Sequence, residues 1–130
     1  CWGRNYIGQL GSKVVGDFNL VPTFVKGVAG ATSLAGGRAH TCAIVDDGGV
    51  KCWGTNEWAQ LGNGSVSFSE TPSAVTGVTG ATAIAAEEFH TCAALEGGSV
   101  TCWGNNKNGE LGTGTPSDNE PVAVAVIGLS

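Results

Sequence analysis

Residues 40–54 read HTCAIVDDGGVKCWG, and residues 90–104 read HTCAALEGGSVTCWG. The two stretches carry the histidine, both cysteines and the closing Cys-Trp-Gly in the same register. A third Cys-Trp-Gly stands at residues 1–3, and each copy is followed by Gln-Leu-Gly or Glu-Leu-Gly, at residues 9–11, 60–62 and 110–112. A period of about 50 residues indicates an array of similar units that bury their hydrophobic surfaces against one another.

Each unit contains four short segments with the composition of β-strands. They are residues 32–35, 40–45, 50–53 and 72–75 in one unit, and 82–85, 90–95, 99–103 and 121–126 in the next. Four strands in about 50 residues, without helical periodicity, predict an all-β fold: a partial β-propeller of four-stranded antiparallel blades. Residues 1–31 are then the end of a truncated blade, and residues 32–80 and 81–130 are two complete blades of one propeller domain fragment.

The spacing of the cysteines predicts two disulfide bonds. If residues 46–48 form a three-residue turn with Gly48 in the left-handed conformation, Cys42 lies opposite Cys52 at a non-hydrogen-bonded position. The same count places Cys92 opposite Cys102. Disulfides at this density indicate an oxidising compartment, hence an extracellular or cell-surface location. Cys1 has no partner in this pattern, so we expect the chain to be an excerpt of a longer protein.

Two other interpretations of the cysteines stay open. All five could be buried free thiols of a cytosolic propeller. A zinc site could use His40, Cys42 and Cys52, but this spacing lacks a Cys-x-x-Cys pair and supplies only three ligands per unit. We therefore predict no metal and no cofactor.

Composition argues against two classes of partner. Only 13% of the residues are charged, the net charge is −5, and the six basic residues form no cluster of the kind that binds nucleic acid. No apolar run approaches the roughly 18 residues of a membrane span. No charged start followed by an apolar core resembles a signal peptide.

The repeated sequence motifs resemble those of a known family. Gly-x-x-His-Thr-Cys-Ala at residues 37–43, followed by Gly-x-Val-x-Cys-Trp-Gly-x-Asn at residues 48–56, is similar to the regulator of chromosome condensation repeat. The cysteine-bearing version resembles that of secreted bacterial members. The resemblance implies about two and a half repeats of what is usually a seven-bladed ring. Self-association of the fragment is one way in which such a ring could close.

The repeat separates constant residues from variable ones. Trp2, Trp53 and Trp103 recur with the period and are expected to pack between blades. His40 and His90 each open a strand, and we expect each to satisfy a neighbouring backbone group. Neither histidine has a Ser, Cys or carboxylate partner set beside it, so no catalytic residue is predicted. Two loops of each blade should share one face, and their variable residues are the candidate binding surface: Tyr6, Arg38, Trp58, Glu87, Glu88, Phe89 and Lys107.

These features predict a non-catalytic interaction scaffold, secreted or at the cell surface, whose loop face binds another protein. The family resemblance also implies a guanine-nucleotide-exchange regulator as an alternative, although no residue of the repeat motif carries that activity. An enzyme in the central channel would need carboxylates on the innermost strands. Residues 32–35 and 82–85 have none, so missing blades would have to supply them. A purely structural array that spaces other domains is the last alternative.

Overall fold

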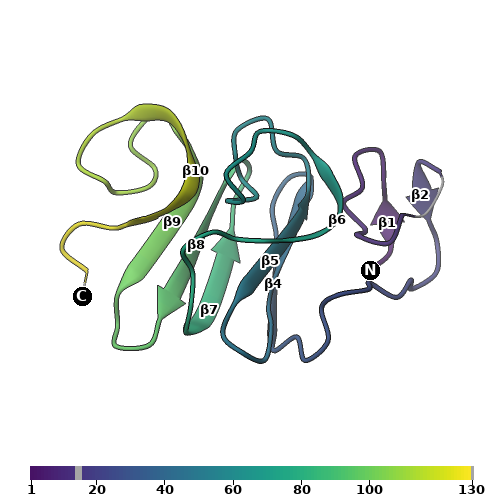
Figure 1. Ribbon diagram of the computed structural model, residues 1–130. Helices are drawn as coiled ribbons and strands as arrows, with labels where there is room; N and C mark the ends of the chain where they lie inside the picture. Colours follow the sequence, from purple (N-terminus) through teal and green to yellow (C-terminus); the bar gives the residue numbers. More distant parts are fainter. Residues whose placement is uncertain (14–15, 130) are drawn as a thin grey trace.

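The computed structural model describes residues 1–13 and 16–129 and shows a partial β-propeller (Figure 1). Two four-stranded antiparallel sheets stand side by side, in the orders β3-β4-β5-β6 and β10-β9-β8-β7, next to a two-stranded sheet, β1-β2. The strands are β1 Gly3–Arg4, β2 Phe18–Asn19, β3 Ser33–Gly36, β4 His40–Ile44, β5 Val50–Gly54, β6 Ser69–Ala74, β7 Ala81–Ala86, β8 His90–Leu95, β9 Val100–Asn106 and β10 Ser117–Ala125. We call β3–β6 the inner blade, β7–β10 the end blade and β1–β2 the half-blade.

The hairpin turns have the expected geometry. In the inner blade Val45 N–H donates to the Gly49 carbonyl and Gly48 N–H donates to the Val45 carbonyl, both at 2.9 Å. Gly48 has φ +74° and Gly98, its equivalent in the end blade, has φ +93°, a region that favours glycine. Cys42 consequently pairs with Cys52 across β4 and β5. The three-residue turn therefore sets the register on which both disulfides depend.

The outermost strands begin earlier than the sequence suggests. β6 begins at Ser69, so Pro72 lies inside this strand rather than at its start. Its missing N–H is tolerated because β6 is at the edge of the sheet. β10 carries an irregularity between Glu120 and Val124, after which Val124 faces Cys102. Between these two pairs β10 has two more residues than β9, as β6 has relative to β5, so the side chains beyond keep their facing.

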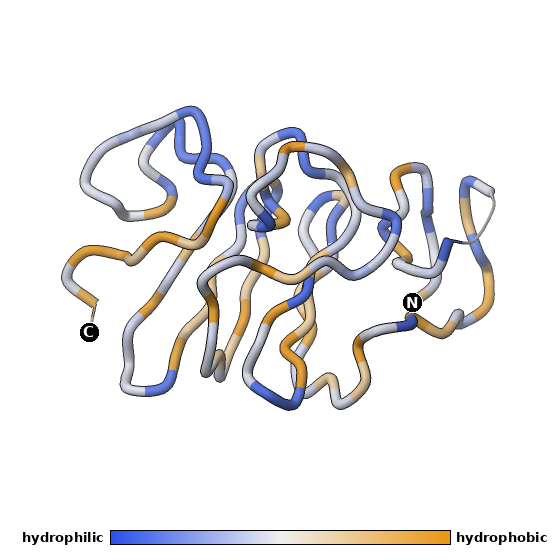
Figure 2. The backbone as a smooth tube through the Cα atoms, in the orientation of Figure 1, coloured by the Kyte–Doolittle hydropathy of each residue, from blue (hydrophilic) through white to orange (hydrophobic). Residues whose placement is uncertain are grey.

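The main core lies between the inner and the end blade. β7 contacts both β3 and β4 across this interface. The buried cluster contains Cys42, Ile44, Val50, Cys52, Leu61, Val75, Val78, Ala81, Ala93 and Trp103. A smaller cluster of Val25, Ala43 and Trp53 joins the half-blade to the inner blade. In Figure 2 the polar colour gathers at the turns, and hydrophobic colour runs along the segment that ends at the C-terminus.

In the described part of the chain, no helix is long and apolar enough to cross a membrane.

Candidate functional site

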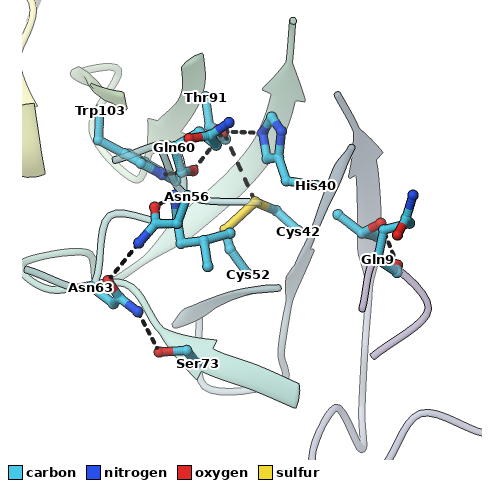
Figure 3. Close-up of a disulfide and its surroundings, with 12 residues drawn as sticks. Gln9, His40, Cys42, Cys52, Asn56, Gln60, Asn63, Ser73, Thr91 and Trp103 are labelled. Carbon is cyan, nitrogen blue, oxygen red and sulfur yellow. Dashed lines mark hydrogen bonds between the residues drawn. A yellow bond between two sulfur atoms is a disulfide. The ribbon is translucent and has the colours of Figure 1, made fainter. Parts of the chain in front are cut away.

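Neighbouring blades are joined by a repeated hydrogen-bond pattern. The backbone carbonyl of Gln60 accepts the indole N–H of Trp103 at 2.9 Å and the hydroxyl of Thr91 at 3.3 Å (Figure 3). One blade earlier, the carbonyl of Gln9 accepts the same two donors from Trp53 and Thr41, at 2.9 and 3.1 Å. The backbone carbonyl of the glutamine before Leu-Gly is therefore the acceptor that links each blade to the following one.

The three repeated tryptophans differ in their surroundings. Trp53 and Trp103 are fully buried between blades, whereas Trp2 is 67% exposed. Trp2 thus departs from the expected packing between blades, whereas the indoles of Trp53 and Trp103 each reach the carbonyl of a Gln-Leu-Gly segment of the preceding blade. The packing of this residue type depends on the preceding blade, and not on Cys-Trp-Gly alone.

His40 is buried against the end blade. Its Nε2 lies 2.9 Å from the hydroxyl of Thr91 (Figure 3). Thr91 has one hydroxyl hydrogen and donates it to Gln60, so the imidazole Nε2–H is the donor to Thr91. Burial, and secondarily the nearby His90, lowers the pKa of His40 from 6.5 to about 4. The ring is neutral at pH 7 and joins two blades; its partner is a side-chain hydroxyl rather than the expected backbone group.

Both expected cysteine pairs form disulfide bonds. Cys42 with Cys52 and Cys92 with Cys102 each have a Cα–Cα distance of 4.1 Å. Such bonded sulfurs cannot act as the thiolates that zinc requires. Among the described residues, no three His, Cys, Asp or Glu side chains are grouped so that they could hold a metal ion.

Sequence reasoning did not single out the asparagines that shape the loops. Asn56 is fully buried, and its Oδ1 accepts the backbone N–H of Leu61 at 2.9 Å. Its Nδ2 donates to the carbonyls of Ser65 and Ser67, at 2.8 and 3.0 Å. Asn106 makes the equivalent contact with Leu111. The recurrence of Asn two residues after each Cys-Trp-Gly was the available signal.

Five of the candidate residues meet on one surface, which we call the loop patch: Arg38, Trp58, Glu88, Phe89 and Lys107. Arg38 Nη1 lies 2.6 Å from Glu88 Oε1, and the guanidinium carbon lies 5.7 Å from the centre of the Phe89 ring. The Phe89 and Trp58 ring centres are 6.0 Å apart at an interplanar angle of 47°. Lys107 Nζ lies 4.4 Å from the centre of the Trp58 ring. The contacts alternate between residues of the inner and the end blade.

Two candidates lie outside this chain of contacts. Tyr6 is exposed on the half-blade, where Arg4 lies 5.7 Å from its ring centre. Glu87 lines an open pocket of about 350 Å³ together with Glu88, Phe89 and His90. The structure therefore divides the expected surface into a connected patch and two peripheral residues.

Comparisons with known proteins agree with this architecture. Two family models described as the regulator of chromosome condensation (RCC1) repeat match residues 31–57 with 81–110, and residues 47–94. The chain is 35% identical over 64 residues to the rat probable E3 ubiquitin-protein ligase HERC4, covering 48% of the chain and 6% of that protein. It is 38% identical over 65 residues to the Arabidopsis thaliana ultraviolet-B receptor UVR8, covering 48% and 14%. It is 41% identical over 68 residues to human protein RCC2, covering 49% and 12%.

Solved structures show the same fold. Prp20p from Saccharomyces cerevisiae superposes with a TM-score of 0.82 at 21% identity, over 96% of this chain and 33% of that one. Human WBSCR16 superposes with a TM-score of 0.83 at 24% identity, over 95% and 33%. The chain thus spans about a third of these structures and a smaller share of the curated relatives. The family models together extend over residues 31–110, so the chain belongs to the regulator of chromosome condensation (RCC1) repeat family.

Proposed function

We propose that the chain is a non-catalytic interaction module that binds another protein through the loop patch. The observation that carries this proposal is the continuous series of contacts from Glu88 through Arg38, Phe89 and Trp58 to Lys107. These residues differ between repeats, whereas the residues that join the blades recur. Variable side chains on a constant scaffold are how repeat proteins acquire binding specificity.

The composition of the loop patch suits a protein partner. Trp58 and Phe89 are half-buried, so each ring is held by the blade and still presents a surface. Aromatic residues and arginine are enriched among the residues that dominate protein interfaces. The side chains of Arg38 and Glu88 remain 66% and 59% exposed, which leaves their polar atoms accessible at the rim.

The polar groups in the core support a non-catalytic role. His40 is neutral and committed to Thr91 of the end blade. The innermost strands, β3 (SLAG) and β7 (ATAIAA), carry no ionisable side chain. A hydrolytic site of the glycosidase type needs two carboxylates at a defined separation, which these strands do not supply.

The disulfides favour a secreted or cell-surface setting for this module. Prp20p is described by its binding to Gsp1p and histones, but that likeness concerns the fold. A net charge of −5 does not favour binding to nucleic acid, and the two disulfides favour an oxidising compartment over the nucleus. A protein partner met outside the reducing cytosol is consistent with both features.

The experiment is affinity capture with the wild-type chain and a Trp58→Ala, Phe89→Ala double variant, followed by a binding measurement with each purified partner. Loss of the large aromatic anchors should weaken binding at least tenfold. Phe68→Ala is the matched control, since Phe68 is an exposed aromatic outside the patch. Equal binding by the double variant and the wild type would contradict the proposal.

A further inference from the structure

Two asparagines of the chain directly precede a glycine: Asn63, before Gly64, and Asn108, before Gly109. This pair is reactive because glycine has no Cβ to shield its backbone nitrogen from the carboxamide of the residue before it. The nitrogen can attack the side-chain Cγ, release ammonia and close a succinimide ring. Water then opens the ring to aspartate or isoaspartate. By sequence alone, both asparagines are therefore candidates for deamidation.

The fold holds both groups that would have to react at Asn63. Its Oδ1 accepts the backbone N–H of Ser65 at 3.1 Å, and its Nδ2 donates to the hydroxyl of Ser73 at 3.0 Å. The Gly64 N–H donates to the carbonyl of Pro121 in β10, at 2.8 Å. The Asn63 side chain is also half-buried. The carboxamide and the attacking nitrogen thus have separate partners, and both sets of hydrogen bonds must break before the ring can close.

Asn108 is exposed, and its side chain bonds to a residue of the same loop. Its Nδ2 donates to Glu110 Oε1 at 3.0 Å, and its backbone N–H donates to Glu110 Oε2 at 2.9 Å. The carboxamide is thus directed toward the residue that follows Gly109. The Gly109 N–H donates to the Asn106 carbonyl at 3.1 Å, within the same turn. Ring closure at Asn108 therefore requires only a local change in an exposed loop.

We propose that Asn108 is a site of spontaneous deamidation, whereas the fold protects Asn63 from the same reaction. The Gly109 nitrogen bonds to Cγ of Asn108 as it loses its proton, and Nδ2 leaves as ammonia. Water then adds to one of the two carbonyl carbons of the succinimide and opens the ring. The product carries a new carboxylate, either on an aspartyl side chain or beside an isoaspartyl backbone linkage.

The product changes the end-blade side of the loop patch. A carboxylate at position 108 cannot donate to Glu110 as the carboxamide does, and the two carboxylates repel each other. Lys107 directly precedes this position, and its Nζ lies 4.4 Å from the centre of the Trp58 ring. The modification therefore places a negative charge beside Lys107 and gives its ammonium group an alternative to the indole.

The experiment follows both asparagines in one peptide map. The chain is incubated at neutral and at mildly alkaline pH with its disulfides intact, and samples are taken over time. Mass spectrometry detects the conversion of amide to acid, and an isoaspartyl methyltransferase labels the isoaspartyl product. A parallel incubation in denaturant and reductant is the reference, because unfolding exposes both Asn-Gly pairs equally.

Gly109→Ala is the matched variant, because it shields the attacking nitrogen in a position that accepts alanine. Ala59 holds the equivalent position of the inner blade with φ +61°, compared with +80° for Gly109. A Cβ placed on Gly109 would meet no atom of the described residues within 4 Å. The variant should therefore fold like the wild type and react more slowly at Asn108.

In the folded chain we expect Asn108 to deamidate at least about tenfold faster than Asn63, because the additional hydrogen bonds of Asn63 must break first. In denaturant the two rates should be similar. Gly109→Ala should slow the reaction at Asn108 and leave the rate at Asn63 unchanged. Similar rates in the folded chain, or an Asn108 that reacts only in denaturant, would overturn the proposal. In Asn108→Asp, an unchanged NMR signal of the Trp58 indole N–H would overturn the effect on the loop patch.

Discussion

The inner blade and the end blade are built from nearly the same sequence, yet equivalent residues have different surroundings. Cys42 is fully buried, whereas Cys92 is half-buried. His40 is 2% exposed and bonded to the next blade, whereas His90 is half-buried. Backbone geometry does not explain the contrast, because both hairpins have the same register and the same Cα–Cα distance across the disulfide.

The contrast teaches that a repeat motif encodes a pair of complementary surfaces. Each blade contributes Thr and Trp donors on one side and a carbonyl, leucine and glycine on the other. Burial follows only where a neighbour is present, so stability is set by nearest-neighbour interfaces as well as by each blade.

The largest difference in the free energy of unfolding is expected between alanine variants of two repeated tryptophans. Trp103→Ala removes a fully buried indole and its hydrogen bond to Gln60, and should lower the free energy of unfolding by about 3–5 kcal/mol. Trp2→Ala should change it by less than about 0.5 kcal/mol in a single copy. Urea unfolding followed by circular dichroism at low protein concentration measures both. Similar losses in the two variants would contradict the difference in packing.

The next effect is a dependence of stability on pH that arises at the blade interface. The pKa of His40 is lowered from 6.5 to about 4 in the fold, so between these values the unfolded chain binds the additional proton. Stability is therefore fully present above pH 6.5 and falls as the pH drops toward 4, by about 3 kcal/mol in total.

The matched comparison uses His40→Gln. This variant should be less stable than the wild type at pH 7, and the difference should shrink as the pH falls from 6.5 to 4. Carboxylates titrate in both proteins and therefore cancel in the difference. A difference that stays constant across this range would show that His40 does not carry the pH dependence.

The two disulfides should contribute equally to stability but react at different rates. Each closes a loop with a sequence separation of 10, for which chain entropy predicts a stabilisation of about 3 kcal/mol. A reductant should open Cys92–Cys102 first, because Cys92 is half-buried while both sulfurs of the other bond are fully buried. Timed alkylation with peptide mass spectrometry measures the reduction rate of each disulfide. Equal rates would contradict the claim that the end blade protects the disulfide of the inner blade.

The smallest effect concerns the ion pair that connects the two blades at the surface. Glu88→Gln weakens the contact with Arg38, and should lower the free energy of unfolding by less than about 1 kcal/mol because both side chains are mostly exposed. Glu87→Gln is the neighbouring control. Thermal melts at low and high salt should show the difference between the variants disappearing in salt. A larger, salt-independent loss would mean that the pair is structurally essential.

Much of the fold could be predicted because the spacing within the repeat determines the pairing register of the central hairpin. The spacing from Cys42 to Cys52, with a glycine suited to the left-handed turn position, determined the hairpin and hence the disulfide. The first residues of the outer strands, β6 and β10, were harder to predict. Asn56 and Asn106 fold their long loops through side-chain hydrogen bonds to carbonyls 9 residues ahead; the asparagine recurs with the repeat, but its spacing does not reveal these acceptors.

The candidate site could be predicted only in part. The alternation of strands placed Arg38, Trp58 and Phe89 on one face, and the structure brings them into contact. The same reasoning grouped Tyr6 with them, because sequence equivalence gives the position within a blade but not the distance between blades. Trp2 was assigned the environment of Trp53 for the same reason.

Hydrogen–deuterium exchange of a sample that sedimentation shows to be monomeric is the most direct test of the claim that a neighbouring blade determines the burial and stability of each repeat. The amides of β4 and β5 should exchange more slowly than those of β8 and β9, because the end blade has one uncovered side and opens at a lower free energy. Equal protection of the two hairpins would show that each blade is stable by itself, and would contradict the account.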